Sequence, residues 1–209
     1  MTSTRAARSE QTVDAILAVV ADLLEAEGYD AVRLRRVAKQ ARVSLATIYK
    51  LFPTRDELIV ATLLRWMEAN AYAGIGDLAP DASLYDGIMW SLRRVFEPWE
   101  RSPRMLEAYH RARTGHGGDR LDVQGLAAVM PVVRAVLKPV DPAYARDLDT
   151  ILRHMAYAVV GRFADGDLAI TEIMPVLQRA VFRLTANAPM RDDWARSTAP
   201  AARPPPGAG

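Results

Sequence analysis

The sequence predicts an all-α protein of about nine helices. Apolar residues recur at intervals of three and four through most of the chain, which is the spacing of an amphipathic helix. No window shows the two-residue alternation of a half-buried strand. A chain of 209 residues can bury a sizeable core without disulfide bonds, and this one has no cysteine.

The first three helices are marked by the residues that flank them. The first carries an apolar stripe and is expected to stop at Gly28, since glycine favours a helix C-terminus. The second is expected from about Leu34 to Ala41, and the third over 45–51, where Ser44 is a good N-cap. The stripe of the first helix consists of Val13, Ile16, Leu17, Val20 and Leu24.

Six further helices are expected after the third. Thr54 and Glu57 have the spacing of a capping box and predict the start of a fourth helix, which continues to about residue 72. Ser83 is the expected cap of the fifth, and Asp141-Pro142 places a cap and a first-turn proline at the eighth. The ranges expected after the fourth helix are 83–101, 103–114, 121–137, 142–163 and 171–184.

The first three expected helices lie within residues 9–53, which we call the head, and the other six lie within residues 54–188. Residues 189–209 contain five prolines and few apolar side chains, and we expect this tail to be disordered. The apolar run over 15–20 is far shorter than the roughly 20 residues of a membrane span. We therefore expect a cytoplasmic protein with no membrane partner.

Catalytic patterns are missing from the sequence. The three histidines have no metal-binding spacing, and there is neither a cysteine nucleophile nor a G-x-S-x-G elbow. We expect no enzyme activity, no metal and no cofactor.

A concentrated basic segment lies in the head. The chain as a whole has a net charge of +2, yet residues 33–55 hold seven basic side chains and no acidic one. Two short helices joined by a tight turn around Arg42 and Val43 form a helix-turn-helix, whose second helix fits the DNA major groove. Charge alone leaves open a merely solvated surface, because basic residues also occupy ordinary helix faces.

The residues of this segment resemble a known family. Residues 37–58 follow the pattern V-A-x-x-A-x-V-S-x-x-T-I-Y-x-x-F-P-T-R-x-E-L, which is similar to the DNA-binding domain of the TetR family of bacterial repressors. The resemblance implies a three-helix DNA-binding domain over 9–53 and a ligand-binding and dimerisation domain over 54–188. The implied partners are a double-stranded DNA operator, a small-molecule effector and a second copy of the chain.

The resemblance also implies DNA contacts in the head. Ser44 caps the recognition helix, Tyr49 reaches a phosphate, and Thr54 with Arg55 forms a phosphate clamp at a helix N-terminus. The full expected set is Arg33, Arg35, Arg42, Ser44, Leu45, Thr47, Tyr49, Lys50, Thr54 and Arg55. The sequence departs from the family at Arg33, at Leu45 in place of a common lysine, and at Arg42 in place of the glycine that suits a left-handed turn.

In the second domain the resemblance implies an apolar effector cavity and a dimer bundle. The expected cavity residues are Trp66, Met67, Trp90, Trp99, Met105, Tyr109, Met130 and Met155; plain core packing is the alternative for each. The expected dimer residues are Ile151, Val159, Ile173, Leu177, Ala180, Val181 and Leu184, for which intramolecular packing is the alternative. Residues 102–112 are also similar to actinobacterial repressors of cholesterol catabolism, which implies a steroid-like or acyl-coenzyme A effector.

These observations favour a homodimeric repressor that a hydrophobic ligand releases from its operator. The alternative is a helical protein that binds or sequesters a small molecule without reading DNA. Arg42 and Leu45 are the departures that favour this alternative.

Overall fold

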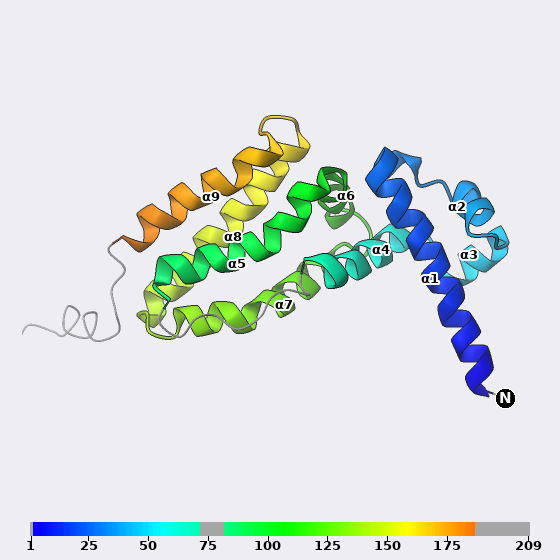
Figure 1. Ribbon diagram of the computed structural model, residues 1–209, viewed down its shortest axis with the longest axis horizontal. Coiled ribbons are helices and arrows are strands. Elements are labelled where there is room, and N and C mark those ends of the chain that lie inside the picture. The colour runs from blue at the N-terminus through cyan, green and yellow to red at the C-terminus, as the bar shows by residue number, and fades with distance from the viewer. Residues whose placement is uncertain (1, 72–81, 187–209) are drawn as a thin grey trace, which may run out of the picture.

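The computed structural model describes residues 2–71 and 82–186, which are helical almost throughout (Figure 1). The expected disorder of residues 189–209 lies outside the described residues. The head contains α1 (Thr2–Glu27), the short 3-10 turn η1 (Tyr29–Ala31), α2 (Leu34–Gln40) and α3 (Leu45–Leu51). The body contains α4 (Arg55–Asn70), α5 (Leu84–Arg101), α6 (Pro103–Arg113), α7 (Asp119–Leu137), α8 (Pro142–Ala164) and α9 (Ile170–Thr185).

Helix boundaries follow the capping chemistry. The side chains of Ser44, Thr54, Ser83 and Asp141 accept backbone N–H bonds at the N-termini of α3, α4, α5 and α8, as the sequence predicts. Gly28 follows the last residue of α1 with φ of 83°, a conformation that glycine adopts without strain.

Three boundaries differ from the sequence prediction. Helix α1 begins at Thr2, well before the apolar stripe, since its first residues contain no helix-breaking proline or glycine. Helix α7 begins at Asp119 rather than at residue 121. Helix α9 begins at Ile170, because the Ala169 amide is capped by Glu172, which accepts its N–H at 2.9 Å.

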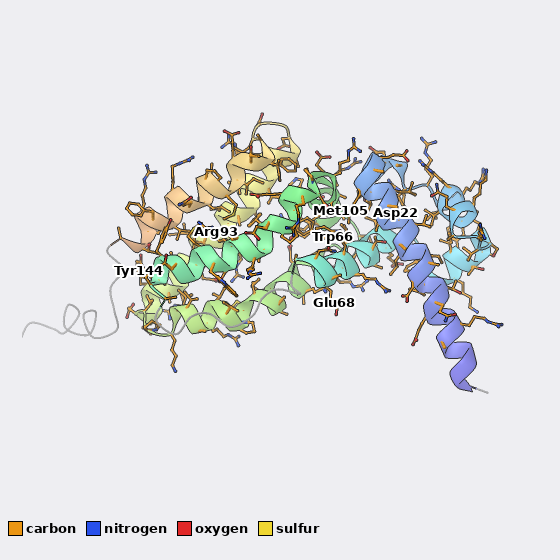
Figure 2. The ribbon with its side chains drawn as sticks, viewed as in Figure 1. Asp22, Trp66, Glu68, Arg93, Met105 and Tyr144 are labelled. Carbon is orange, nitrogen blue, oxygen red and sulfur yellow. The ribbon has the colours of Figure 1, made fainter. Side chains whose placement is uncertain are left out.

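Helix α4 connects the head to the body, and the two parts share one buried core (Figure 1). Leu58 and Ile59 near its start are fully buried beside the head residues Ile16, Val37 and Ile48. The later residues Trp66 and Met67 are buried at the junction with the body. Trp66 of α4 and Met105 of α6, which are labelled in Figure 2, both belong to the buried core, and these two helices are in contact. The orientation of the head is therefore set by buried packing as well as by the covalent chain.

Candidate nucleic-acid interface and effector cavity

The turn between α2 and α3 gives the head its helix-turn-helix geometry. Arg42 has φ of 56°, the left-handed conformation that the sequence predicts for this position. The next residue, Val43, donates its backbone N–H to the Ala38 carbonyl at 3.0 Å, which closes the turn. The turn thus fixes α3 against α2 and leaves the Arg42 side chain exposed.

Helix α3 presents hydroxyl groups at its N-terminus and an aromatic ring on its surface. Ser44 Oγ accepts the Thr47 amide at 3.0 Å and lies 2.8 Å from Thr47 Oγ1. Tyr49 is 52% exposed, and Lys50 beside it is also exposed. Thr54 is exposed as well, although its hydroxyl caps α4 by accepting the Glu57 amide. These positions form an exposed polar face that is suited to a DNA backbone and base edges.

The cationic surface of the head is smaller than the sequence indicates. Arg36 makes a two-point ion pair with Glu27, with contacts of 2.5 and 2.8 Å, so that its charge is neutralised within the head. This pair also lowers the pKa of Glu27, mainly because Arg36 donates to the carboxylate. The basic side chains that remain exposed in the segment are Arg33, Arg35, Lys39, Arg42 and Lys50.

Arg55, which the resemblance places in a phosphate clamp, forms hydrogen bonds within the head. Its Nε donates to the Val32 carbonyl at 2.7 Å and its Nη2 to the Tyr29 carbonyl at 2.5 Å. Its guanidinium also lies 4.6 Å from the centre of the Tyr29 ring. Tyr29 begins η1 and Val32 directly follows this turn, and the Tyr29 carbonyl also accepts the Val32 amide at 3.4 Å. Arg55 therefore holds this loop against α4 and is expected to stabilise the head rather than to bind DNA.

Leu45, another of the expected DNA contacts, is partly buried and packs against the hydrophobic core. Its apolar side chain forms part of the packing between α3 and the rest of the head.

A second arginine links the head to the body through α6. Arg111 pairs with Asp30 through two hydrogen bonds of 2.9 and 3.0 Å, and its guanidinium lies 4.3 Å from the centre of the Tyr29 ring. The Tyr29 ring therefore lies against the guanidinium groups of Arg55 and Arg111. Burial and the nearby Asp56, which accepts the Tyr29 hydroxyl at 3.2 Å, raise the pKa of Tyr29. We call the contact among Arg111, Asp30 and Tyr29 the α6 latch.

The body contains an elongated apolar cavity between α5, α7 and α8. It consists of a proximal lobe of about 210 Å³, which also contacts α4 and α6, and a distal lobe of about 170 Å³. The lobes adjoin each other and share the lining residues Ser91, Leu92, Leu126, Val129, Val133, Arg153 and Ala156. A narrow apolar space with few polar groups is typical of a small-molecule site.

Half of the predicted effector residues line this cavity. Met67, Trp99 and Tyr109 border the proximal lobe, and Met130 borders the distal lobe. Trp66 and Met105 are buried in the core instead, and Met155 packs against that core. Trp90 lies apart, in a surface depression beside Arg94. Core packing was the alternative at each position, and periodicity cannot separate a lining side chain from a neighbour one turn away.

Apart from Tyr109, the polar groups of the cavity were missed by the sequence analysis. Asp122 accepts a hydrogen bond from the Tyr109 hydroxyl at 3.0 Å and another from Arg113 at 3.2 Å. Burial and the charge of Asp122 raise the pKa of Tyr157. Arg153 borders both lobes and pairs with Asp149, four residues earlier on α8. The spacing of that pair was the signal available in the sequence, although the same spacing is common on solvated helices.

Aromatic side chains connect the cavity to the base of the head. The ring centres of Tyr109 and Trp99 are 5.4 Å apart, and those of Trp99 and Trp66 are 4.5 Å apart. The Trp66 indole then donates to the Glu25 carboxylate on α1 at 3.0 Å. A packed path therefore runs from the lining of the cavity to α1.

Most of the predicted dimer residues pack inside the protomer. Val159, Ile173, Leu177 and Val181 are buried between helices of the same chain, which was the alternative interpretation of these stripes. Ala180 and Leu184 are half-buried, and Ile151 is 47% exposed. Phe182, which the sequence analysis did not select, is 63% exposed on α9. The apolar stripes of α8 and α9 therefore pack mainly within the protomer.

Two family models match the chain and together cover most of it. The model described as bacterial regulatory proteins of the tetR family matches residues 16–62, and the tetracyclin repressor-like C-terminal domain matches residues 82–184. These matches agree with the helix-turn-helix head and the helical body. The chain belongs to the TetR family, which places it among transcriptional regulators rather than enzymes.

Individual relatives point in the same direction. The transcriptional repressor KstR of Rhodococcus jostii is 31% identical over 105 residues, which is 50% of this chain and 47% of that protein. KstR of Mycolicibacterium smegmatis is 31% identical over 106 residues, half of each protein. The chain thus spans about half the length of these curated relatives. A TetR transcriptional regulator from Rhodococcus sp. RHA1 has the same fold, with a TM-score of 0.63 and 20% identity over 85% of this chain and 97% of that one.

Two further features of the described residues bear on the kind of site. No helix within residues 2–71 and 82–186 combines the length and the apolarity that crossing a membrane requires. Within the same ranges, no group of three or more histidine and acidic side chains is arranged to hold a metal ion.

Proposed function

We propose that this protein is a homodimeric, sequence-specific repressor that a hydrophobic small molecule releases from its operator. The observation that carries the proposal is the exposed face of α3 with its surrounding arginines, in the same protomer as an elongated apolar cavity. Five exposed basic side chains are available to phosphates, while the Ser44, Thr47 and Tyr49 hydroxyls lie where a groove would meet α3.

Helix α6 is the element that best supports ligand control. Tyr109 faces the cavity and Arg111 holds Asp30 of the head, and the two residues are two positions apart. Positions two apart lie on different sides of an α-helix, so α6 has one side in the effector site and another on the head. A ligand that shifts α6 therefore alters the α6 latch. In a dimer this changes the separation of the two α3 helices, which must match about 34–36 Å on DNA or a multiple of it.

The effector class rests on the shape of the cavity and on similarity to repressors. An elongated apolar body fits the two lobes, and both a steroid-like and an acyl-chain molecule have that shape. Release requires the ligand to bind the DNA-incompetent arrangement more tightly than the DNA-bound one.

The proposal is tested by fluorescence anisotropy on a duplex from the region upstream of the protein's own gene, with a scrambled duplex as control. Specific binding should show a steep dependence on salt concentration, because each neutralised phosphate releases counterions. The double change Thr47→Ala with Lys50→Ala should abolish the preference for the operator and leave ligand affinity unchanged. Arg134→Ala, an exposed arginine on α7, is the matched surface control.

The alternative function is a protein that binds or sequesters a small molecule without reading DNA. It predicts equal, weak binding to both duplexes and no preferred site in a genome-wide selection of bound fragments. It also predicts that the Thr47 and Lys50 changes have no functional effect.

A further inference from the structure

The polar wall of the cavity has an unequal supply of donors and acceptors. Both carboxylate oxygens of Asp122 are engaged, Oδ1 by the Tyr109 hydroxyl and Oδ2 by Arg113. In the described part of the chain, the hydrogen bond found for the Arg153 guanidinium uses Nη2 alone, to Asp149. A guanidinium carries five N–H donors in a planar fork. The hydrogen-bonding groups that this wall can still offer to a ligand are therefore the other N–H donors of Arg153.

The direction of the Arg153 side chain places these donors at the distal end of the cavity. Side chains on an α-helix lean toward its N-terminus, and Arg153 pairs with Asp149 one turn earlier. Asp149 and its neighbour Leu148 line the distal lobe, whereas Val160 lines the proximal lobe near α6. The eleven residue steps from Asp149 to Val160 span roughly 16 Å at 1.5 Å per residue.

The pair between Arg153 and Asp149 is one that a ligand can replace. The Arg153 side chain is 36% exposed and the Asp149 side chain 32% exposed. An ion pair that is open to solvent contributes little to stability, so exchanging one carboxylate partner for another costs little. A carboxylate on a ligand also suits a guanidinium better than other acceptors do, since it accepts two parallel charge-assisted hydrogen bonds.

We propose that the effector is an elongated hydrophobic carboxylate whose carboxylate binds Arg153 in place of Asp149. Its apolar body runs through both lobes and ends against Trp99 and Tyr109, beside α6. This inference rests on the proposed function, because it takes the cavity as the effector site. The proposed site at Arg153 favours a free acid over a thioester, because a thioester presents only a neutral carbonyl to the guanidinium.

Isothermal titration calorimetry on the full-length protein tests the inference with dodecanoate, 1-dodecanol and dodecanoyl-coenzyme A. Dodecanoate should bind about tenfold or more tightly than dodecanol, which has the same chain without the charge. Arg153→Met should remove this preference. Asp149→Asn should strengthen dodecanoate binding roughly twofold to fivefold, because the competing carboxylate is gone. Arg146→Met, which removes an exposed arginine of α8 outside the cavity lining, should leave all three affinities unchanged.

The opposite signs at Arg153 and Asp149 separate recognition from misfolding, since an unfolded variant cannot gain affinity. Equal binding of dodecanoate and dodecanol would overturn the inference, as would tighter binding of the thioester. Operator binding without any dodecanoate binding would also overturn it, while leaving the repressor function in place. Dodecanoate binding through Arg153 without any operator preference would instead overturn the repressor function and support the carboxylate site.

Discussion

Arg42 has a strained left-handed backbone conformation, and it carries a positive charge next to the proposed DNA-binding helix. A non-glycine residue at φ of 56° is strained by about 1 kcal/mol, because its Cβ crowds the neighbouring carbonyl. We predict that Arg42→Gly raises the free energy of unfolding by about 0.5 kcal/mol and weakens operator binding. The slope of log affinity against log salt should fall by about 1, as expected when one phosphate contact is lost.

Urea unfolding and salt-dependent anisotropy measure the two effects separately. The second variant is Arg42→Asn, because asparagine tolerates the left-handed conformation and this change removes the same charge. Arg35→Gly is not a suitable control, because a glycine within α2 would itself destabilise that helix. A variant that gains neither stability nor a shallower salt slope would show that Arg42 is neither strained nor close to DNA.

Arg55 has a structural role at the residue scale. Arg55→Ala leaves the carbonyls of Val32 and Tyr29 without their charged donor, so we predict a loss of about 2 kcal/mol in the free energy of unfolding. Lys50→Ala should instead leave the urea midpoint unchanged and weaken DNA binding. If Arg55→Ala unfolds at the same urea concentration as the parent protein but loses operator affinity, Arg55 binds phosphate after all.

The contrast between Arg42 and Arg55 shows what a local pattern specifies. The family pattern at residues 42–44 predicted both the left-handed turn and the Ser44 cap, because those features depend on adjacent residues. The direction of Arg55 depends on carbonyls more than 20 positions away. A charged residue at a helix N-terminus has several partners within reach, and the sequence does not rank them.

At the scale of helices, the capping residues predicted where α3, α4, α5 and α8 begin. The apolar stripes did not predict which helix or which chain covers them. Ser83 and Asp141 cap α5 and α8 as expected, since an N-cap is decided within one turn. The stripes of α8 and α9 were consistent with a dimer seam, yet Val159 and Leu177 are buried within the protomer. A stripe shows that a face is covered but gives no information about which chain covers it.

The α6 latch yields a prediction about how elements are coupled. Arg111→Ala should speed amide hydrogen exchange across residues 29–53, because it removes the bidentate pair with Asp30 and the contact with Tyr29. Asp30→Asn should have a smaller effect, since it removes the ion pairs of Asp30 with Arg111 and Arg55 but keeps the contact between Arg111 and Tyr29. The double variant should exchange no faster than Arg111→Ala, which a double-mutant cycle detects. Fully additive effects would mean that the two side chains act independently.

The same contact has a defined pH dependence. Hydrogen bonds from Arg111 lower the pKa of Asp30 from its ordinary value of 3.8. A lowered carboxylate pKa contributes stability that is present above the unfolded-state value and is lost as the pH falls through the folded-state value. The difference in thermal midpoint between the parent protein and Asp30→Asn should therefore be constant from about pH 8 to pH 5 and shrink below pH 3.8. A difference that disappears near neutral pH would assign the effect to another group.

At the scale of the whole molecule, the family resemblance predicted the division into head and body, and the residues 16–62 and 82–184 match its two models. The interdomain contacts were not predictable in the same way. Arg111 and Asp30 are 81 positions apart, and Trp66 and Glu25 are 41 positions apart. Such pairs become visible when the helices are packed, because many acidic and basic residues along the chain satisfy the same chemical rule.

The proposed dimerisation is a property of the whole molecule, and we expect it to involve the exposed apolar residues of α8 and α9. Ile151 and Phe182 are 47% and 63% exposed. Ile151 lies near the middle of α8, and Phe182 lies in the last turn of α9, where its ring packs edge-on against Tyr85 at 6.2 Å between ring centres. A two-fold axis beside α8 and α9 would bury Ile151 and Phe182 against the same helices of the second copy, with the Phe182 ring as an anchor.

We therefore predict that Ile151→Glu with Phe182→Glu converts the protein to a monomer, because two like charges would face their copies across the axis. Analytical ultracentrifugation measures the change, and operator affinity should fall with it, since a monomer engages one half-site at a time. Val123→Glu is the matched control: this residue is 67% exposed on α7, and the variant should remain dimeric with unchanged operator affinity. A double variant that still sediments as a dimer would place the two-fold axis on another face. The surface of α7 would then be the next candidate for the dimer interface, because it carries two further exposed apolar residues, Val123 and Leu126.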